Sequence, residues 1–181
     1  MSESGRWPAQ RSFIIGSLQL PTHCSMSNFQ LVGLPDQVFA PLFELSDEEL
    51  RARGIQRRLA DESPGFPCRI SLQDAALGEE LLLLPHVHHD VDSPYRASGP
   101  IFVRRGARQA LLPPGEVPEV VTRRLISARA YDKQHLMVTG EVCEGVQVAA
   151  TLQRLLADER VAYIQLHNAR QGCFSCHVNR V

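Results

Sequence analysis

The sequence predicts a single α+β domain with a largely antiparallel sheet and two to three helices. Two observations predict this class: short alternating or apolar segments recur along most of the chain, and only a few segments repeat apolar residues at helical spacing. A chain of 181 residues suits one domain, and an apolar fraction of 44% is enough for one core.

The first 25 residues differ from the rest. Their apolar stretch, at positions 13–20, is short, is diluted by glycine, serine and glutamine, and precedes no small-x-small cleavage site. We therefore predict a disordered or misassigned extension at 1–25 and a domain over 26–181. The protein is expected to be cytoplasmic with reduced thiols.

Helices are predicted at three places. Asp36 can cap a brief helical turn. Ser46 and Glu49 have the spacing of a capping box, which predicts a helix that Gly54 ends. From Val148 onward, apolar residues recur at helical spacing and predict a helix of about 12 residues.

Strands are predicted where apolar residues alternate or run together between turn residues. The predicted strands are residues 29–32, 68–72, 81–84, 101–103, 160–166 and 174–178, with a hairpin formed by 120–131 and 136–143. Pro85 is expected to end its strand, which leaves a long loop over 86–100.

The charge pattern excludes some partners. A net charge of −1 predicts no nucleic-acid binding, and no apolar run is long enough for a membrane span. The arginine pairs 57–58, 104–105 and 123–124 are assigned to strands and helix ends. The residues predict no cofactor and do not predict an oligomeric state.

Three segments carry a resemblance to a known family. They are "GFPCRISLQDA" (65–75), "DSPYRASGPIFVR" (92–104) and "HNARQGCFSCHVNR" (167–180). Together they resemble the bacterial family of domains of unknown function 1203, from about Phe29 to the end. The resemblance implies a small soluble domain and supplies no catalytic residue. This chain departs from the family pattern in its histidine-rich "PHVHHDVD" and in having His177 where relatives often carry arginine.

The C-terminal "CFSCH" has the spacing of a haem-attachment site and of half a zinc site. Covalent haem is not expected, because it requires export and a second axial ligand. A zinc-stabilised structural module remains an alternative, with Cys173, Cys176 and His177 as ligands and His167, Cys68 or the cluster of His86, His88 and His89 completing the set. Cys143 and at least one of Cys173 and Cys176 are otherwise expected to be buried as small apolar residues.

Two further arrangements are possible. His86-x-His88-x-Asp90 begins the signature of binuclear metallo-hydrolases, but its last histidine is missing, so an exposed polar loop is the preferred interpretation. A cysteine-dependent enzyme would use Cys68 or Cys173 as nucleophile, with His88 or His167 as base.

The leading hypothesis is a small polar pocket for an anionic small molecule, built around the loop at 92–104. Arg96 suits bidentate binding of a carboxylate or phosphate, and Ser98 and Gly99 add donors. His88, His167 and Asn168 are expected nearby, with Cys68 or Cys173 close to them. Alternatively, Arg96 pairs with Asp92 or a buried carbonyl and only holds the loop. Whether the protein is an enzyme stays open.

Overall fold

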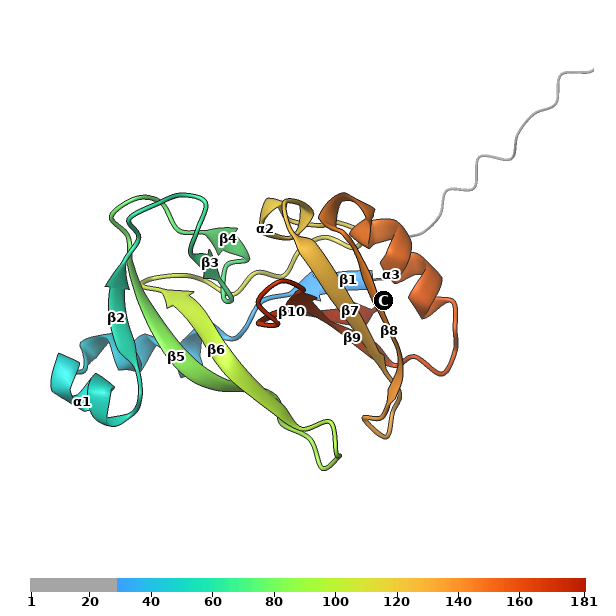
Figure 1. The fold of residues 1–181 in the computed structure, drawn as a ribbon, viewed down its shortest axis with the longest axis horizontal. Coiled ribbons are helices and arrows are strands. Elements are labelled where there is room, and N and C mark those ends of the chain that lie inside the picture. Colours follow the sequence, from blue (N-terminus) through green and yellow to red (C-terminus); the bar gives the residue numbers. More distant parts are fainter. Residues whose placement is uncertain (1–28) are drawn as a thin grey trace, which may run out of the picture.

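The computed structural model describes residues 29–181, which form two five-stranded sheets flanked by short helices (Figure 1). The predictions for residues 1–25 and for a start at Met26 lie outside this range. The predicted α+β class with mainly antiparallel pairing is confirmed. No helix in the described part of the chain is long and apolar enough to cross a membrane.

The first sheet, sheet A, has the strand order β1-β10-β9-β7-β8 with antiparallel neighbours throughout. Its strands are β1 (Phe29–Val32), β7 (Leu125–Tyr131), β8 (Met137–Glu144), β9 (Tyr163–Asn168) and β10 (Phe174–Arg180). The helix α3 (Val148–Leu156) packs on one face, where Leu152 and Leu156 join Ile164 and Leu166 in the main core. Because strand side chains alternate, the residues between those core positions face the other side of the sheet.

The second sheet, sheet B, has the order β2-β5-β6-β3-β4, and only β3 and β6 are parallel. Its strands are β2 (Gln56–Leu59), β3 (Pro67–Cys68), β4 (Gln73–Asp74), β5 (Glu80–His89) and β6 (Ala97–Arg104). The β5–β6 hairpin is long, and it reaches past β3 toward the face of sheet A that α3 leaves uncovered (Figure 1).

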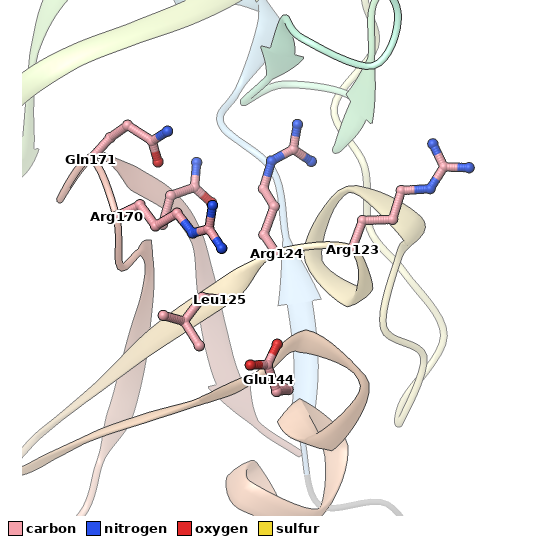
Figure 2. Close-up of a pocket in the computed structure, with 7 residues that line it drawn as sticks. Arg123, Arg124, Leu125, Glu144, Arg170 and Gln171 are labelled. Carbon is pink, nitrogen blue, oxygen red and sulfur yellow. The ribbon is translucent and has the colours of Figure 1, made fainter.

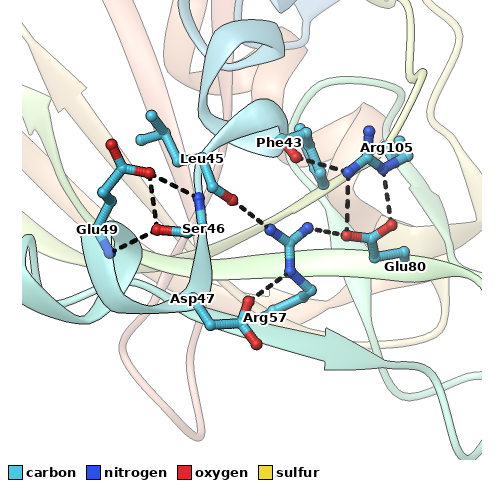
Figure 3. Close-up of polar contacts among 8 residues, drawn as sticks. All are labelled: Phe43, Leu45, Ser46, Asp47, Glu49, Arg57, Glu80 and Arg105. Carbon is cyan, nitrogen blue, oxygen red and sulfur yellow. Dashed lines mark hydrogen bonds and ion pairs between the residues drawn. The ribbon is translucent and has the colours of Figure 1, made fainter.

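The remaining helices are short. They are η1 (Asp36–Val38), η2 (Ala40–Glu44), α1 (Asp47–Ala52), α2 (Glu119–Thr122) and η3 (Gly145–Gln147). The capping box predicted for α1 is confirmed: the Ser46 N–H donates to Glu49 Oε2 at 2.8 Å, and the Glu49 N–H donates to Ser46 Oγ at 3.3 Å (Figure 3). Arg57 of β2 donates to the Leu45 carbonyl and to Asp47 Oδ1, which fixes α1 against sheet B.

The chain crosses from sheet A to sheet B directly after β1. The Gly33 N–H donates to the Ala110 carbonyl at 2.8 Å, and the Ala110 N–H donates to the Ile70 carbonyl at 2.9 Å. A Cβ at position 33 would lie 2.0 Å from the Ile70 oxygen, so only glycine fits this crossing.

The predicted loop over 86–100 is wrong, because β5 continues through Pro85 to His89. The partner strand β2 reaches no farther than the position opposite Leu83. Pro85 therefore lies where one edge of β5 is already free of a partner, and sheets tolerate proline at such a position. Across the hairpin it faces Pro100.

Other predicted strand and helix boundaries differ from those in the structure, and the reasons lie in the local sequence. The predicted strand at 68–72 stops at Cys68, because the following residues turn and buried Leu72 has a φ of 52°. The predicted strand from Val120 begins only at Leu125, since Pro118 starts the short helix α2. The helix from Val148 has nine residues. The strand β2 was not predicted.

Candidate functional site

The residues predicted to bind an anion do not form one site in the structure. Arg96 lies in the turn between β5 and β6, where it pairs with Asp90 at 2.6 Å and its side chain is 61% exposed. Ser98 and Gly99 lie within β6, and neither contacts Arg96 through a hydrogen bond. The alternative in which Arg96 holds the loop through a carboxylate fits this pair, although the partner is Asp90 and not Asp92.

Five histidines gather between the β5–β6 hairpin and the uncovered face of sheet A. This histidine cluster comprises His86, His88, His89, His167 and His177. The His88 ring stacks on Phe174, with centroids 5.1 Å apart and 6° between the planes, and the rings of His167 and His177 lie 5.8 and 5.0 Å from the same phenylalanine. The expected exposed polar loop is therefore wrong: His88 is a buried strand residue.

Gln165 of β9 joins the two strands at the centre of this cluster. Its Nε2 donates to the His88 carbonyl at 3.0 Å, and its Oε1 lies 3.3 Å from His88 Nδ1, which donates to it. The same Oε1 lies 3.4 Å from His167 Nε2, while His167 Nδ1 lies 3.2 Å from the Gly172 carbonyl. Both atoms facing His167 are acceptors, so a neutral His167 ring satisfies only one of them.

A second chain of hydrogen bonds holds the hairpin tip. His89 Nδ1 lies 2.8 Å from the Tyr95 carbonyl and must donate to it, and His89 Nε2 lies 2.8 Å from the Tyr163 hydroxyl oxygen. The same Tyr163 oxygen lies 2.8 Å from His135 Nδ1. Ser93 Oγ completes the contact by donating to the His135 carbonyl.

Burial keeps three rings of the histidine cluster uncharged at neutral pH. It lowers the pKa of His167 to about 3, with the nearby Arg129 charge acting in the same direction. It lowers the pKa of His177 to about 4, and it also lowers the pKa of His88. His88, His167 and His177 are thus neutral rings between the two sheets at neutral pH.

The four cysteines that the structure describes do not complete a metal or nucleophile site. Cys176 is 1% exposed and lies in the core beneath α3, whereas His177 faces the histidine cluster, so the two neighbours point to opposite faces of β10. Within residues 29–181, no group of three His, Cys, Asp or Glu side chains is placed to hold a metal ion. Cys68 is buried, Cys173 is half-buried, and neither is hydrogen-bonded to a histidine in this range. The expectation that Cys143 and at least one of Cys173 and Cys176 are buried is confirmed, because Cys143 and Cys176 both lie in the core.

An open pocket of about 310 Å³ lies at the beginning of β7, and we call it the arginine pocket (Figure 2). Its lining residues are Arg123, Arg124, Leu125, Glu144, Asn168, Arg170 and Gln171. They come from the α2–β7 junction, the end of β8 and the β9–β10 turn. Gly172 closes that turn with a φ of 74°, and its N–H donates to the Asn168 carbonyl at 2.7 Å.

One wall of the arginine pocket is a fixed ion pair. Arg124 donates to both carboxylate oxygens of Asp74, at 2.7 and 3.1 Å, and to the Val120 carbonyl. Arg69 lies close to this pair, is 4% exposed, and donates from Nε to the Phe174 carbonyl at 2.9 Å. Burial lowers the pKa of Arg69 to about 10, and the Arg124 charge also lowers it. Arg69 stays protonated at neutral pH, and it forms no ion pair with a described carboxylate.

The other side of the arginine pocket has unpaired groups. Arg170 is exposed and makes no ion pair or side-chain hydrogen bond to a described residue. Asn168 is 7% exposed, and its buried Oδ1 has no hydrogen-bond partner among residues 29–181. A buried acceptor left without a donor costs about 1–3 kcal/mol, so this atom favours a ligand that donates to it.

Of the predicted site residues, only Asn168 lines the arginine pocket. Its neighbour His167 points to the opposite face of β9 and belongs to the histidine cluster. The three arginine pairs were assigned to strands and helix ends without distinction, and Arg123–Arg124 directly follows α2. The sequence did not show that Arg170 would line the same pocket. The glycine at position 172, which is typical of a turn, was the sequence feature that indicated a turn next to Arg170.

The fold and this site define a mixed α+β protein with two packed sheets and an arginine-lined pocket. The family model described as protein of unknown function (DUF1203) matches residues 65–180. The chain belongs to this family, as the three sequence segments predicted, and the match includes every residue that lines the arginine pocket. Comparison with curated proteins and with solved structures finds no match.

Proposed function

We propose that this protein binds a small anionic molecule in the arginine pocket. The observation that carries this proposal is the excess of cations around the cavity: three arginines line it, against the single carboxylate of Glu144. The volume of about 310 Å³ lies at the lower end of the range for small-molecule sites.

The arginines differ in how freely they can reach a ligand. Arg124 is already bound to Asp74, so it contributes charge and a rigid wall. Arg123 pairs only with Glu119, and both side chains are about half or more exposed. Arg170 is free to form a bidentate contact with a carboxylate or phosphate, for which the planar guanidinium is well suited.

The buried charge of Arg69 adds to this field. Removing a charge from water without an opposite partner is unfavourable, so a bound anion nearby would stabilise the protein. Arg69 and Arg124, with Asp74 as their one carboxylate neighbour, leave a net positive charge beside the pocket, which favours an anion there.

The test is calorimetric titration of residues 1–181 with phosphate, sulfate and succinate. We expect binding of at least one of these anions, and a loss of about tenfold or more in affinity for Arg170→Gln, because a charged hydrogen bond contributes about 1.5–3 kcal/mol. Arg53→Gln is the matched control, since Arg53 is also exposed but lies at the end of α1. Absence of binding, or an equal loss in both variants, would reject the proposal.

A further inference from the structure

The arginine pocket offers acceptors as well as cations. Asn168 Oδ1 is buried without a partner, and the Glu144 carboxylate makes no ion pair or hydrogen bond to a described residue. In sheet A the two residues flank the beginning of β7, because Glu144 is opposite Leu125 and Asn168 is opposite Ile126. Figure 2 shows the Glu144 carboxylate below the guanidinium groups of Arg124 and Arg170.

A simple oxyanion fits this side of the pocket poorly. The oxygens of sulfate and of a plain carboxylate are acceptors at neutral pH, so they would meet Asn168 Oδ1 without a hydrogen bond. Phosphate keeps a proton that it can donate, but its negative charge, like theirs, would be repelled by Glu144. An inorganic anion is also much smaller than the cavity of about 310 Å³. The acceptors therefore require a second, donating group on the same molecule.

We propose that the ligand is a small organic acid that also carries a hydroxyl or an amino group, an inference that rests on the proposed function. Its acid group pairs with Arg170, and its donor meets Asn168 Oδ1 and Glu144. Hydroxy acids and amino acids share this chemistry, and Glu144 distinguishes them. An ammonium group gains from the carboxylate charge, whereas a hydroxyl group does not need it.

The experiment compares succinate, malate and aspartate, which share one carbon skeleton and differ by a hydrogen, a hydroxyl or an amino group. We expect malate or aspartate to bind about tenfold or more tightly than succinate, because satisfying a buried acceptor recovers the cost of leaving it unpaired. In Asn168→Leu this preference should disappear while succinate affinity remains. Asn179→Leu, an exposed position on β10, is the control.

Glu144→Gln provides a second variant at an exposed position, in case the buried substitution prevents folding. It should weaken aspartate binding if the ligand is an amino acid, and leave malate unchanged or tighter if it is a hydroxy acid. Equal affinity for all three acids in the parent protein would overturn this inference and leave the anion site standing. No Arg170-dependent binding of any acid would reject the anion site as well.

Discussion

The histidine cluster and the arginine pocket begin at adjacent residues of one strand, yet they differ in almost every physical respect. His167 faces the hairpin of sheet B, is fully buried and contacts other protein groups. Asn168 faces the opposite side and lines the arginine pocket, and its buried Oδ1 has no hydrogen-bond partner among residues 29–181. In the histidine cluster, polar residues pair with one another and join the two sheets. In the arginine pocket, some members are left unpaired by described residues, and it is there that we propose a ligand binds.

The substitution Phe174→Ala tests whether the histidine cluster holds the two sheets together, and it has the largest expected effect. Phe174 is 1% exposed and contacts three histidine rings, so its truncation should lower the free energy of unfolding by about 3–5 kcal/mol. Val146→Ala, at a side chain that is 78% exposed, should change it by less than about 0.5 kcal/mol. Urea unfolding measures both. Similar midpoints for the two variants would show that the histidine cluster does not hold the sheets together.

Lowering the pH should decrease the free energy of unfolding through the histidine cluster. The pKa values of His167 and His177, about 3 and 4, lie below the unfolded value near 6.5, so the unfolded state binds more protons in this window. Stability is fully present above about pH 6.5 and should fall as the pH decreases, by up to about 1.4 kcal/mol per pH unit for each histidine.

Urea unfolding between pH 7 and pH 5 tests this slope before carboxylates begin to titrate. His177→Gln should remove part of it, since one histidine no longer takes up a proton on unfolding. A parent protein equally stable at pH 7 and pH 5 would contradict the neutral, buried state of these rings.

The substitution Glu119→Gln tests whether Arg123 contributes to anion affinity in the arginine pocket. The substitution releases Arg123 from its exposed ion pair and should tighten anion binding by up to about fivefold, because such pairs contribute about 0.2–1 kcal/mol. Glu159→Gln makes the same change of charge at an exposed position after α3. Calorimetric titration with the anion bound by the parent compares them. The same gain in both variants would assign the effect to net charge alone.

The smallest effect is expected at Arg96. Its pair with Asp90 is exposed on both sides, so Arg96→Ala should lower the free energy of unfolding by less than about 1 kcal/mol and leave anion affinity unchanged. Thermal unfolding with and without succinate measures both quantities. Loss of anion binding in this variant would restore the hairpin turn as the binding site.

The sequence by itself determined the features that depend on neighbours along the chain. The capping box at Ser46, the helical spacing from Val148 and the alternation before Asn168 each specify local backbone geometry, and the structure contains all three elements. The family relationship was equally visible, because it rests on contiguous segments.

Only the tertiary structure decided which of these elements meet. His88 and Gln165 are 77 positions apart and bond to each other because the β5–β6 hairpin folds back onto sheet A. Arg124 and Arg170 share a pocket because β9 pairs with β7, and register is set by packing of the whole sheet rather than by either strand alone. Since adjacent strand residues point to opposite faces, that same pairing separated His167 from Asn168, which the linear sequence had placed in one site.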